Sequence, residues 1–548
     1  MILGALMTLS LAADPNAEAA QLIDAHLKIV QPLERKANLA WWNANTTGSD
    51  AEFKRKEEAQ NELDAALSNK ERFAALKKMH DAGDVSDPIL KREIHLLYLQ
   101  YLEKQVDPSL LKKMTAKANA IEKAFNAYRA ELRGQEIGDG KVRDILKNST
   151  DSKELQTVWE SSKGVGAALE KDLKELVGLR NQAAKALGFD NFHSMMLTLN
   201  EQDPKEVLKL FDDLNAMTRE PFNKAKAEID ERLAKRFNCS VADLRPWHYQ
   251  DPFFQESPAV FTADLDAPYK KADILKMCSS FYKGNGMPID DVIARSDLYE
   301  KSGKSPHAFC TDIDREGDVR VLGNIVPTEY WAGTMLHELG HSVYSSKNIP
   351  KSLPYVLRCE SHILTTEGVA MMFERFSKNG AFLEKMNIPV SDRATFDDSA
   401  RRMRRNRLLI FSRWCQVMLR FEQGLYSNPD QDLNALWWSL VEKYQGLKKP
   451  DGRNAPDYAS KVHIVTAPCY YHNYEMGELF ACQVHYAMVN ALQPGTHPRD
   501  AVYVNDPRVG DWMREHVFSQ GRLLPWNDLT KHATGKPLNP EAFAEDLK

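Results

Sequence analysis

Two histidines and a glutamate stand at a spacing that could hold a metal ion and use it. They lie in Met335–Ser342 (MLHELGHS), which contains the pattern HExxH. Residues four apart on a helix lie nearly above one another, so His337 and His341 can direct two imidazoles at one cation. Glu338 would then reach a water at that cation and accept its proton. The pattern predicts one Zn²⁺ per chain and hydrolytic chemistry, whereas the plain alternative is two surface histidines on a helix.

A third protein ligand must complete such a site and leave one position open to water. Three glutamates follow at intervals of seven, Glu360, Glu367 and Glu374, which predicts a shared helix face. Glu360 lies 19 residues beyond His341, a spacing that some zinc aminopeptidases use, and Glu367 lies 26 beyond it. The spacing alone leaves both open as the ligand. A glutamate that is not a ligand could orient a ligand histidine or pair with a neighbouring arginine.

A second group of hydrogen-bond donors lies in the last quarter of the chain. It consists of Lys461, His463, Tyr470, Tyr471 and Tyr474. Hydrolysis of an amide develops negative charge on the carbonyl oxygen, and a positioned donor stabilises that charge. Tyrosines at such spacing are more often core or rim residues, so this group by itself is weak evidence.

The elements that must position these residues are mostly helices. Helical periodicity covers five long stretches, residues 21–39, 50–82, 89–105, 110–132 and 168–189. Prolines, Pro221 among them, break the middle of the chain into shorter pieces. Residues 307–313 and 319–325 predict a β-hairpin, after which Pro327 and Thr328 open the helix that carries HExxH. With no repeat or linker, we expect one mostly α domain with a small β-sheet near the active site.

Composition describes a globular chain with ample core. The 548 residues are 43% apolar and 27% charged, with a formal net charge of -5. No basic stripe suggests nucleic acid, and we interpret the arginine run between Arg401 and Arg407 as a solvated or ion-paired helix face. The seven cysteines are scattered and form no CxxC pattern. We expect mainly buried thiols rather than a cysteine metal site; one or two disulfides are the alternative that the sequence leaves open.

The N-terminal residues Ile2–Ala13 (ILGALMTLSLAA) are apolar and end in small residues. That pattern is typical of a secretory signal, although a positive segment before it is missing. We therefore expect a signal peptide over residues 1–13 and a periplasmic or secreted protein; the alternative is a frayed terminus on a cytoplasmic one. The stretch is short for a membrane span, and no later segment is long and apolar enough.

Further motifs follow one another in a fixed order. The longest is Trp437–Leu447 (WWSLVEKYQGL), and Lys461–Ile464 (KVHI) comes after it. Shorter ones are Ser305–Phe309 (SPHAF), Phe518–Arg522 (FSQGR) and Thr534–Pro537 (TGKP), with fainter ones in Leu39–Thr46 and Asn181–Gly188. Together they resemble the angiotensin-converting-enzyme family of zinc peptidyl-dipeptidases. The resemblance implies a two-lobed, mostly α fold with a deep central cleft.

The resemblance also implies roles for the matching residues around the metal. His337, His341 and Glu367 would bind zinc, because the family's third ligand follows at a spacing closer to that of Glu367 than to that of Glu360. Glu338 would be the general base and later the general acid. His463 and Tyr474 would stabilise the oxyanion.

Substrate contacts follow from the same resemblance. His307 and Ala308 would bind the substrate backbone from a strand edge. Lys461 and Tyr471 would hold the C-terminal carboxylate of the peptide. That contact implies release of C-terminal dipeptides from oligopeptide substrates.

Several positions depart from the family's pattern. The segment after His463 is one residue longer, so Tyr470 competes with Tyr471, and no matching glutamine for the substrate carboxylate is identified. Val441 and Asn473 replace two arginines that bind chloride, so chloride activation is not expected. Met371 replaces an aspartate, whereas Glu367 with Glu374 resembles the related thimet and oligoendopeptidase type.

The sequence therefore predicts a single metallopeptidase domain over residues 14–548, with helices of residues 21–132 forming a lid. An oligoendopeptidase with the same metal site is the nearest alternative. A catalytically silent peptide-binding protein on this scaffold is another, and an aminopeptidase would need Glu360 as the ligand.

Overall fold

The computed structural model describes residues 14–260 and 264–548, so the predicted export signal lies outside the described residues. The chain is 68% helical, which confirms the predicted mostly α class. The helices are α1 Pro15–Thr47, α2 Asp50–Leu67, α3 Lys70–Ala82, α4 Pro88–Glu103, α5 Pro108–Ala127, α6 Asp139–Asn148, α7 Ser152–Ala186, α8 Phe192–Leu199, α9 Pro204–Phe237, α10 Ile274–Gly284, α11 Asp290–Arg295, α12 Glu329–Val343, α13 Ile363–Glu374, α14 Gly380–Lys385, α15 Arg393–Ser427, α16 Leu433–Gln445, α17 His463–Thr466, α18 His472–Leu492, α19 Arg508–His516, α20 Trp526–Thr534 and α21 Glu541–Asp546. The strands are β1 Ala130–Leu132, β2 Gln135–Ile137, β3 Phe309–Asp312 and β4 Val319–Leu322.

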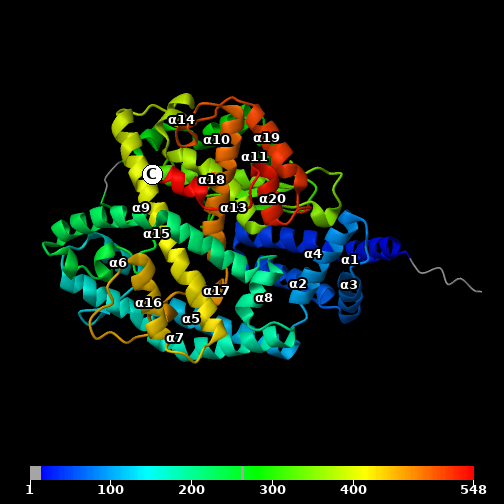
Figure 1. Ribbon diagram of the computed structural model, residues 1–548, viewed down its shortest axis with the longest axis horizontal. Helices are drawn as coiled ribbons and strands as arrows, with labels where there is room; N and C mark the ends of the chain where they lie inside the picture. The colour runs from blue at the N-terminus through cyan, green and yellow to red at the C-terminus, as the bar shows by residue number, and fades with distance from the viewer. Residues whose placement is uncertain (1–13, 261–263) are drawn as a thin grey trace, which may run out of the picture.

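The helices form two lobes that share one core. Figure 1 shows α10, α13, α14 and α18–α20 in the upper lobe and α5–α7 and α16 in the lower one, with the long helices α9 and α15 crossing between them. Leu173 of α7, Leu409 of α15 and Met476 of α18 belong to the same buried cluster. Burial of that shared apolar surface joins the lobes into one body.

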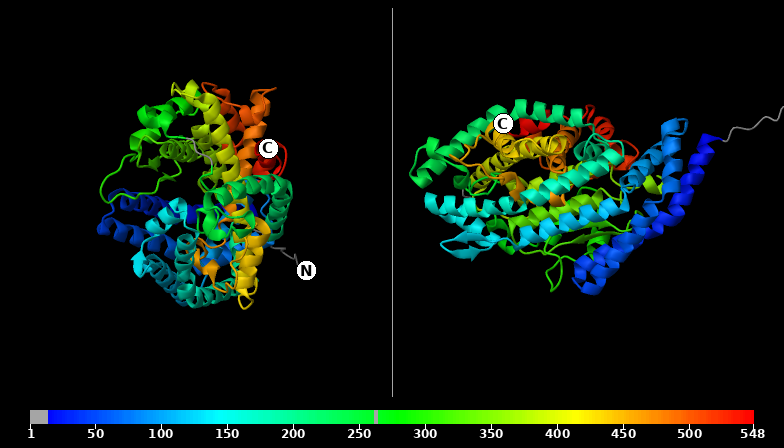
Figure 2. Two further views of the ribbon diagram at one scale, coloured as in Figure 1. Left: turned by 90° about the vertical axis from the view of Figure 1, so that its left-hand side faces the viewer. Right: turned by 90° about the horizontal axis from the view of Figure 1, so that it is seen from below.

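The first four helices form an arm at one end of the body (Figures 1 and 2). The arm has its own core, in which Ile23 and Val30 of α1 pack with Leu97 and Tyr101 of α4. Helix α1 reaches the active-site hairpin, where the ring of Trp41 lies 4.1 Å from that of Phe309. The lid function proposed for these helices stays a prediction.

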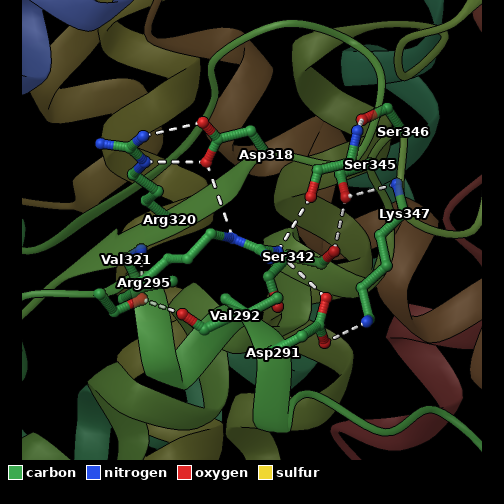
Figure 3. Close-up of polar contacts among 12 residues, drawn as sticks. Asp291, Val292, Arg295, Asp318, Arg320, Val321, Ser342, Ser345, Ser346 and Lys347 are labelled. Carbon is green, nitrogen blue, oxygen red and sulfur yellow. Dashed lines mark hydrogen bonds and ion pairs between the residues drawn. The ribbon is translucent and has the colours of Figure 1, made fainter.

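The predicted hairpin is present as β3 and β4, which pair antiparallel with Cys310 opposite Val321. A polar network fastens it to the end of α12 (Figure 3). Asp291 of α11 pairs with Arg295 and with Lys347, just after α12, while Arg295 and Arg320 both pair with Asp318. These ion pairs fix β4 relative to α12, the helix that carries HExxH.

Three predicted elements are wrong in detail. The stretch 50–82 is two helices, because Asn69 caps α3 and accepts a hydrogen bond from the Arg72 N–H at 2.8 Å. The stretch 110–132 ends as helix at Ala127 and continues into strand β1. Pro221 lies inside α9 rather than ending it, because the packing of buried Phe222 and Ala225 outweighs one lost backbone hydrogen bond.

Two further predictions concern cysteines and membranes. All seven cysteines are free thiols, four of them fully buried, so the structure shows none of the disulfides that the sequence left open. Over the described ranges 14–260 and 264–548, helices long and apolar enough to cross a bilayer are absent.

Candidate active site

Helix α12 presents the HExxH residues on one face because its other face is buried. The Thr328 hydroxyl caps the helix by accepting a hydrogen bond from the Trp331 N–H at 3.3 Å. Leu336 and Leu339 are fully buried beneath the motif. At Gly340, a Cβ would lie 2.8 Å from the Cα of Ala370, so only glycine lets α12 approach α13 this closely.

The structure brings His337, His341 and Glu367 together, each with one possible ligand atom within 4.8 Å of the others. The Nε2 atoms of the two histidines face each other at 3.1 Å, and Nε2 of His337 lies 3.4 Å from the Glu367 carboxylate. Among the described residues, this is the one cluster of three or more such side chains that could hold a metal.

The hydrogen bonds behind the two rings show that the cluster fits a cation. Nδ1 of His337 lies 3.0 Å from the Glu374 carboxylate, and Nδ1 of His341 lies 2.7 Å from the Thr366 hydroxyl. If each Nδ1 carries the proton that it donates to oxygen, each Nε2 presents a lone pair. Two lone pairs and a carboxylate converging at this distance repel one another unless a cation lies between them. A His₂Glu set with one open position is typical of catalytic zinc.

Glu360 does not share the helix of the other two glutamates. It precedes α13, which begins at Ile363, and it is half-buried outside the cluster. The predicted common helix face is therefore wrong for Glu360, because the chain turns before α13 starts. The geometry favours Glu367 as the third ligand, and Glu374, at the last position of α13, orients His337 as the sequence suggested.

Glu338, the glutamate of HExxH, lies in an environment suited to proton transfer. Burial raises the pKa of Glu338 to about 7, and the negative charges of Glu367 and Glu374 add to that effect. His337 and the backbone N–H of Cys310 act in the opposite direction on the same carboxyl. A carboxyl with a pKa near neutral can accept a proton and later return it.

His463 and Tyr474 come from two different helices, α17 and α18. Nδ1 of His463 is buried and has no hydrogen-bond partner among the described residues. Burial, together with the charge of Lys461, lowers the pKa of the ring to about 4. Tyr474 is half-buried. Burial raises the pKa of its hydroxyl, and the negative charge of Glu367 adds to that effect. Both side chains are thus neutral at pH 7 and have the chemistry of hydrogen-bond donors.

The structure separates the two competing tyrosines. The hydroxyl of Tyr471 lies 3.4 Å from Nζ of Lys461, whereas Tyr470 packs on Tyr474 at 5.2 Å and is near Glu367. Tyr471 is therefore the partner of Lys461, as the resemblance implied.

Gln255 is the functional candidate that sequence reasoning missed. Its side-chain oxygen accepts a hydrogen bond from Nζ of Lys461 at 2.7 Å and lies 3.4 Å from the Tyr471 hydroxyl. The loop carrying it is held by Asp251, which accepts from the backbone N–H groups of Phe253 and Gln255 at 2.9 Å. We call Gln255, Lys461 and Tyr471 the carboxylate-anchor cluster, after the role that the resemblance implied for Lys461 and Tyr471.

A sequence signal for that loop did exist. Gln445, in the motif that resembles the angiotensin-converting-enzyme family, donates to the carbonyl oxygens of Phe253 and Phe254 at 2.9 Å. The motif therefore positions the Gln255 loop, but the spacing of its residues does not predict which loop Gln445 contacts.

His307 and Ala308 lie directly before β3, the strand whose Cys310 N–H faces the carboxyl of Glu338. His307 is exposed, and its backbone N–H lies 3.3 Å from the Ser305 hydroxyl. Within the described ranges, β3 pairs with β4 alone, so its other edge is unpaired. A strand edge beside the candidate base can accept an extended peptide.

Comparison with known families fits this geometry. Residues 13–239 match the family model described as angiotensin-converting enzyme, and residues 293–548 match the model of peptidase family M3. The chain is thus similar to one family over its first part and to the other over its second part. The predicted resemblance is thereby confirmed, and the matches support a zinc metallopeptidase with a resident metal.

The individual relatives share little sequence identity with this chain. It is 20% identical to an angiotensin-converting enzyme of Theromyzon tessulatum over 91% of this chain and 85% of that protein. It is 22% identical to an inactive angiotensin-converting enzyme-related protein of Caenorhabditis elegans, over 72% of this chain and 47% of the other. For an angiotensin-converting enzyme of Mesocricetus auratus the identity is 21%, over 72% of this chain and 32% of the relative. The chain thus spans half or less of the latter two relatives.

Proposed function

We propose that this metallopeptidase hydrolyses oligopeptides and releases dipeptides from their C-termini. The observation that carries the proposal is the carboxylate-anchor cluster, in which Lys461 supplies a buried positive charge. The C-terminal carboxylate of a peptide would neutralise that charge, with Gln255 and Tyr471 as further polar partners. Cleavage of internal bonds needs no such contact.

The anchor lies close to the candidate catalytic residues. The ring of Tyr471 lies 5.6 Å from that of Tyr474 and 5.3 Å from that of His463, and Tyr474 in turn feels the charge of Glu367. A peptide anchored at its terminus would therefore present a bond near its end to the metal triad. That geometry supports exopeptidase rather than internal cleavage.

Each step of the reaction has a candidate residue. A zinc ion held by His337, His341 and Glu367 would supply Lewis acidity for the carbonyl and the attacking water. Glu338 takes the proton of the water on its carboxylate and returns it to the leaving amine. His463 and Tyr474 donate hydrogen bonds to the oxygen that gains negative charge. Ala308 and the free edge of β3 hold the substrate backbone.

Matched peptides test the proposal. We expect a free-acid peptide to lose C-terminal dipeptides in sequence, and its C-terminal amide to be cleaved at least about tenfold more slowly, since each lost charge contact is worth roughly 1.4 kcal/mol or more. Mass spectrometry of the products at early times distinguishes the two patterns. Equal rates for acid and amide, with internal fragments, would reject dipeptide release.

That opposite result would establish the second candidate, an oligoendopeptidase. Two observations favour it as the runner-up: residues 293–548 match peptidase family M3, and Glu367 with Glu374 follows the oligopeptidase pattern. Both candidates use the same metal triad.

A catalytically silent protein on this scaffold is the third candidate, because one relative is named as inactive. The complete set of His337, Glu338, His341 and Glu367 supports activity instead. Glu338→Gln keeps the shape of the side chain but removes the base, so we expect turnover to fall by about 10²–10⁴ while zinc content stays the same. Unchanged turnover in that variant would remove Glu338 from the mechanism.

A further inference from the structure

A cavity of about 400 Å³ lies where the end of α13, the start of α15 and the C-terminal residues meet. Arg375 in its lining directly follows Glu374, the partner of His337. The lining contains Arg401, Arg402, Arg404 and Arg405, four members of the run that the sequence predicted to be a solvated or ion-paired helix face, and each of the four pairs with a carboxylate. The cationic members are Arg375, Lys378, Arg401, Arg402, Arg404, Arg405, Arg499 and Lys548, against the acids Asp398, Asp500 and Asp546. The cavity shares no lining residue with the metal triad, His463 or the carboxylate-anchor cluster. We call it the arginine cavity.

Positive charge is in excess at the base of the cavity. Asp546 is fully buried at its side chain and faces two guanidinium groups, that of Arg375 at 2.9 Å and that of Arg404. The two arginine side chains are themselves only 11% and 20% exposed. One carboxylate neutralises one of them, so a net positive charge remains where solvent screens it poorly.

Carboxylates pair with four further cations of the lining, Lys378, Arg402, Arg405 and Lys548. The remaining positive charge at the rim comes from Arg499 and Arg401. Arg499 forms no ion pair within 4.0 Å among the residues that the structure describes. Arg401 has one distant pair, with Asp500 at 3.9 Å, and both side chains are more than half exposed. Such pairs contribute little, so both guanidinium groups are available to a ligand.

The chemistry of the lining selects the class of ligand. Guanidinium groups match the oxygens of phosphate through paired N–H donors, and several together suit an anion of high charge. The ring of Phe376, the one aromatic side chain of the lining, is 1% exposed and offers no stacking surface for a nucleobase. The volume admits an anion larger than a single phosphate.

We propose that the arginine cavity binds an inorganic phosphate-bearing anion of the pyrophosphate class. The site is distinct from the peptide-binding residues. Its contacts come from Arg401 and Arg499 at the rim and from Arg375 and Arg404 at the base.

Titration calorimetry of the zinc-loaded protein with pyrophosphate tests the proposal, at constant ionic strength with chloride as the balancing anion. We expect one site per chain with a dissociation constant in the micromolar to submillimolar range, and weaker binding of orthophosphate. Arg401→Gln with Arg499→Gln should weaken pyrophosphate binding at least tenfold. ATP should bind no more tightly than pyrophosphate, because the cavity offers nothing to the base.

Two controls separate the site from other effects. Arg133→Gln with Arg508→Gln removes the same charge at positions outside the cavity lining and should leave the affinity within about twofold. Zinc content after the titration, compared between the two double variants, separates chelation of the metal from binding in the cavity. Equal affinities in the two double variants, or saturation by chloride, would overturn the proposal.

Discussion

Nζ of Lys461 lies 2.7 Å from the side-chain oxygen of Gln255, although 206 residues separate them in the chain. The contact joins the segment just before α17 to the loop between α9 and α10. It defines the place where a peptide terminus would be held, and it leads directly to the first prediction.

Gln255→Ala should raise the KM of a free-acid peptide by about 10- to 100-fold, because one hydrogen bond to a charged group contributes roughly 1.5–3 kcal/mol. The kcat should change little, since the glutamine would contact the terminal carboxylate and not the reacting carbonyl. The KM of the amidated peptide should not change. Gln431→Ala is the matched control, because Gln431 bonds only to backbone carbonyls near the end of α15. A fall in kcat with unchanged KM would contradict the assignment.

The charge of Lys461 predicts a pH dependence. Burial lowers the pKa of Lys461 to about 8, although Asp251 and Glu256 favour the charged form. The ammonium is therefore present below pH 8 and is lost above it, so the KM of free-acid peptides should rise between roughly pH 7.5 and 9. The KM of acid and amide peptides, measured over that pH range, checks this prediction. Lys461→Arg stays charged over the range, so its KM should depend little on pH.

Glu374 is expected to strengthen metal binding without being a ligand. Its carboxylate accepts from Nδ1 of His337 at 3.0 Å and so fixes the ring and its tautomer. Glu374→Gln should lower zinc affinity by about 10- to 100-fold, as loss of such outer partners typically does. Competition with a chromogenic chelator measures the affinity, and circular dichroism verifies the fold. Undiminished zinc affinity would show that Glu374 plays no part in orienting His337.

Gly340→Ala tests the close packing of α12 on α13 that brings the metal ligands together. Alanine there would place its Cβ 2.8 Å from the Cα of Ala370, so α12 and α13 must separate. We expect a loss of about 1–3 kcal/mol in the free energy of unfolding, as for overpacked cores, together with weaker zinc binding.

Gly178→Ala is the matched control, since a Cβ at this position of α7 would meet no atom within 4 Å and the change should stabilise the helix by about 0.5–1 kcal/mol. Denaturant unfolding of both variants measures the difference. Equal stability of the two alanine variants would show that the helix contact is not close.

Local spacing determined the part of the site that lies on one element. The four-residue separation of His337 and His341 is close to one helical turn, so the sequence predicted their convergence without knowledge of the rest of the fold. The hairpin before them and the helix start at Thr328 were predicted for the same reason, because turn and capping signals act over a few residues. The mostly α class followed from the periodicity of long segments such as that within α7.

Tertiary structure alone decided which distant residues join that element. Spacing left Glu360 and Glu367 open, and likewise Tyr470 and Tyr471; the family resemblance favoured Glu367 and Tyr471. The physical reason came from the structure, in the turn before α13 and in the contact of Tyr471 with Lys461. Gln255 entered the site through a loop held by Asp251 and Gln445, and the arginine run became one wall of a cavity that Asp546 completes. These contacts join residues far apart in the chain, and their geometry is set by the packing of whole helices, which no local spacing encodes.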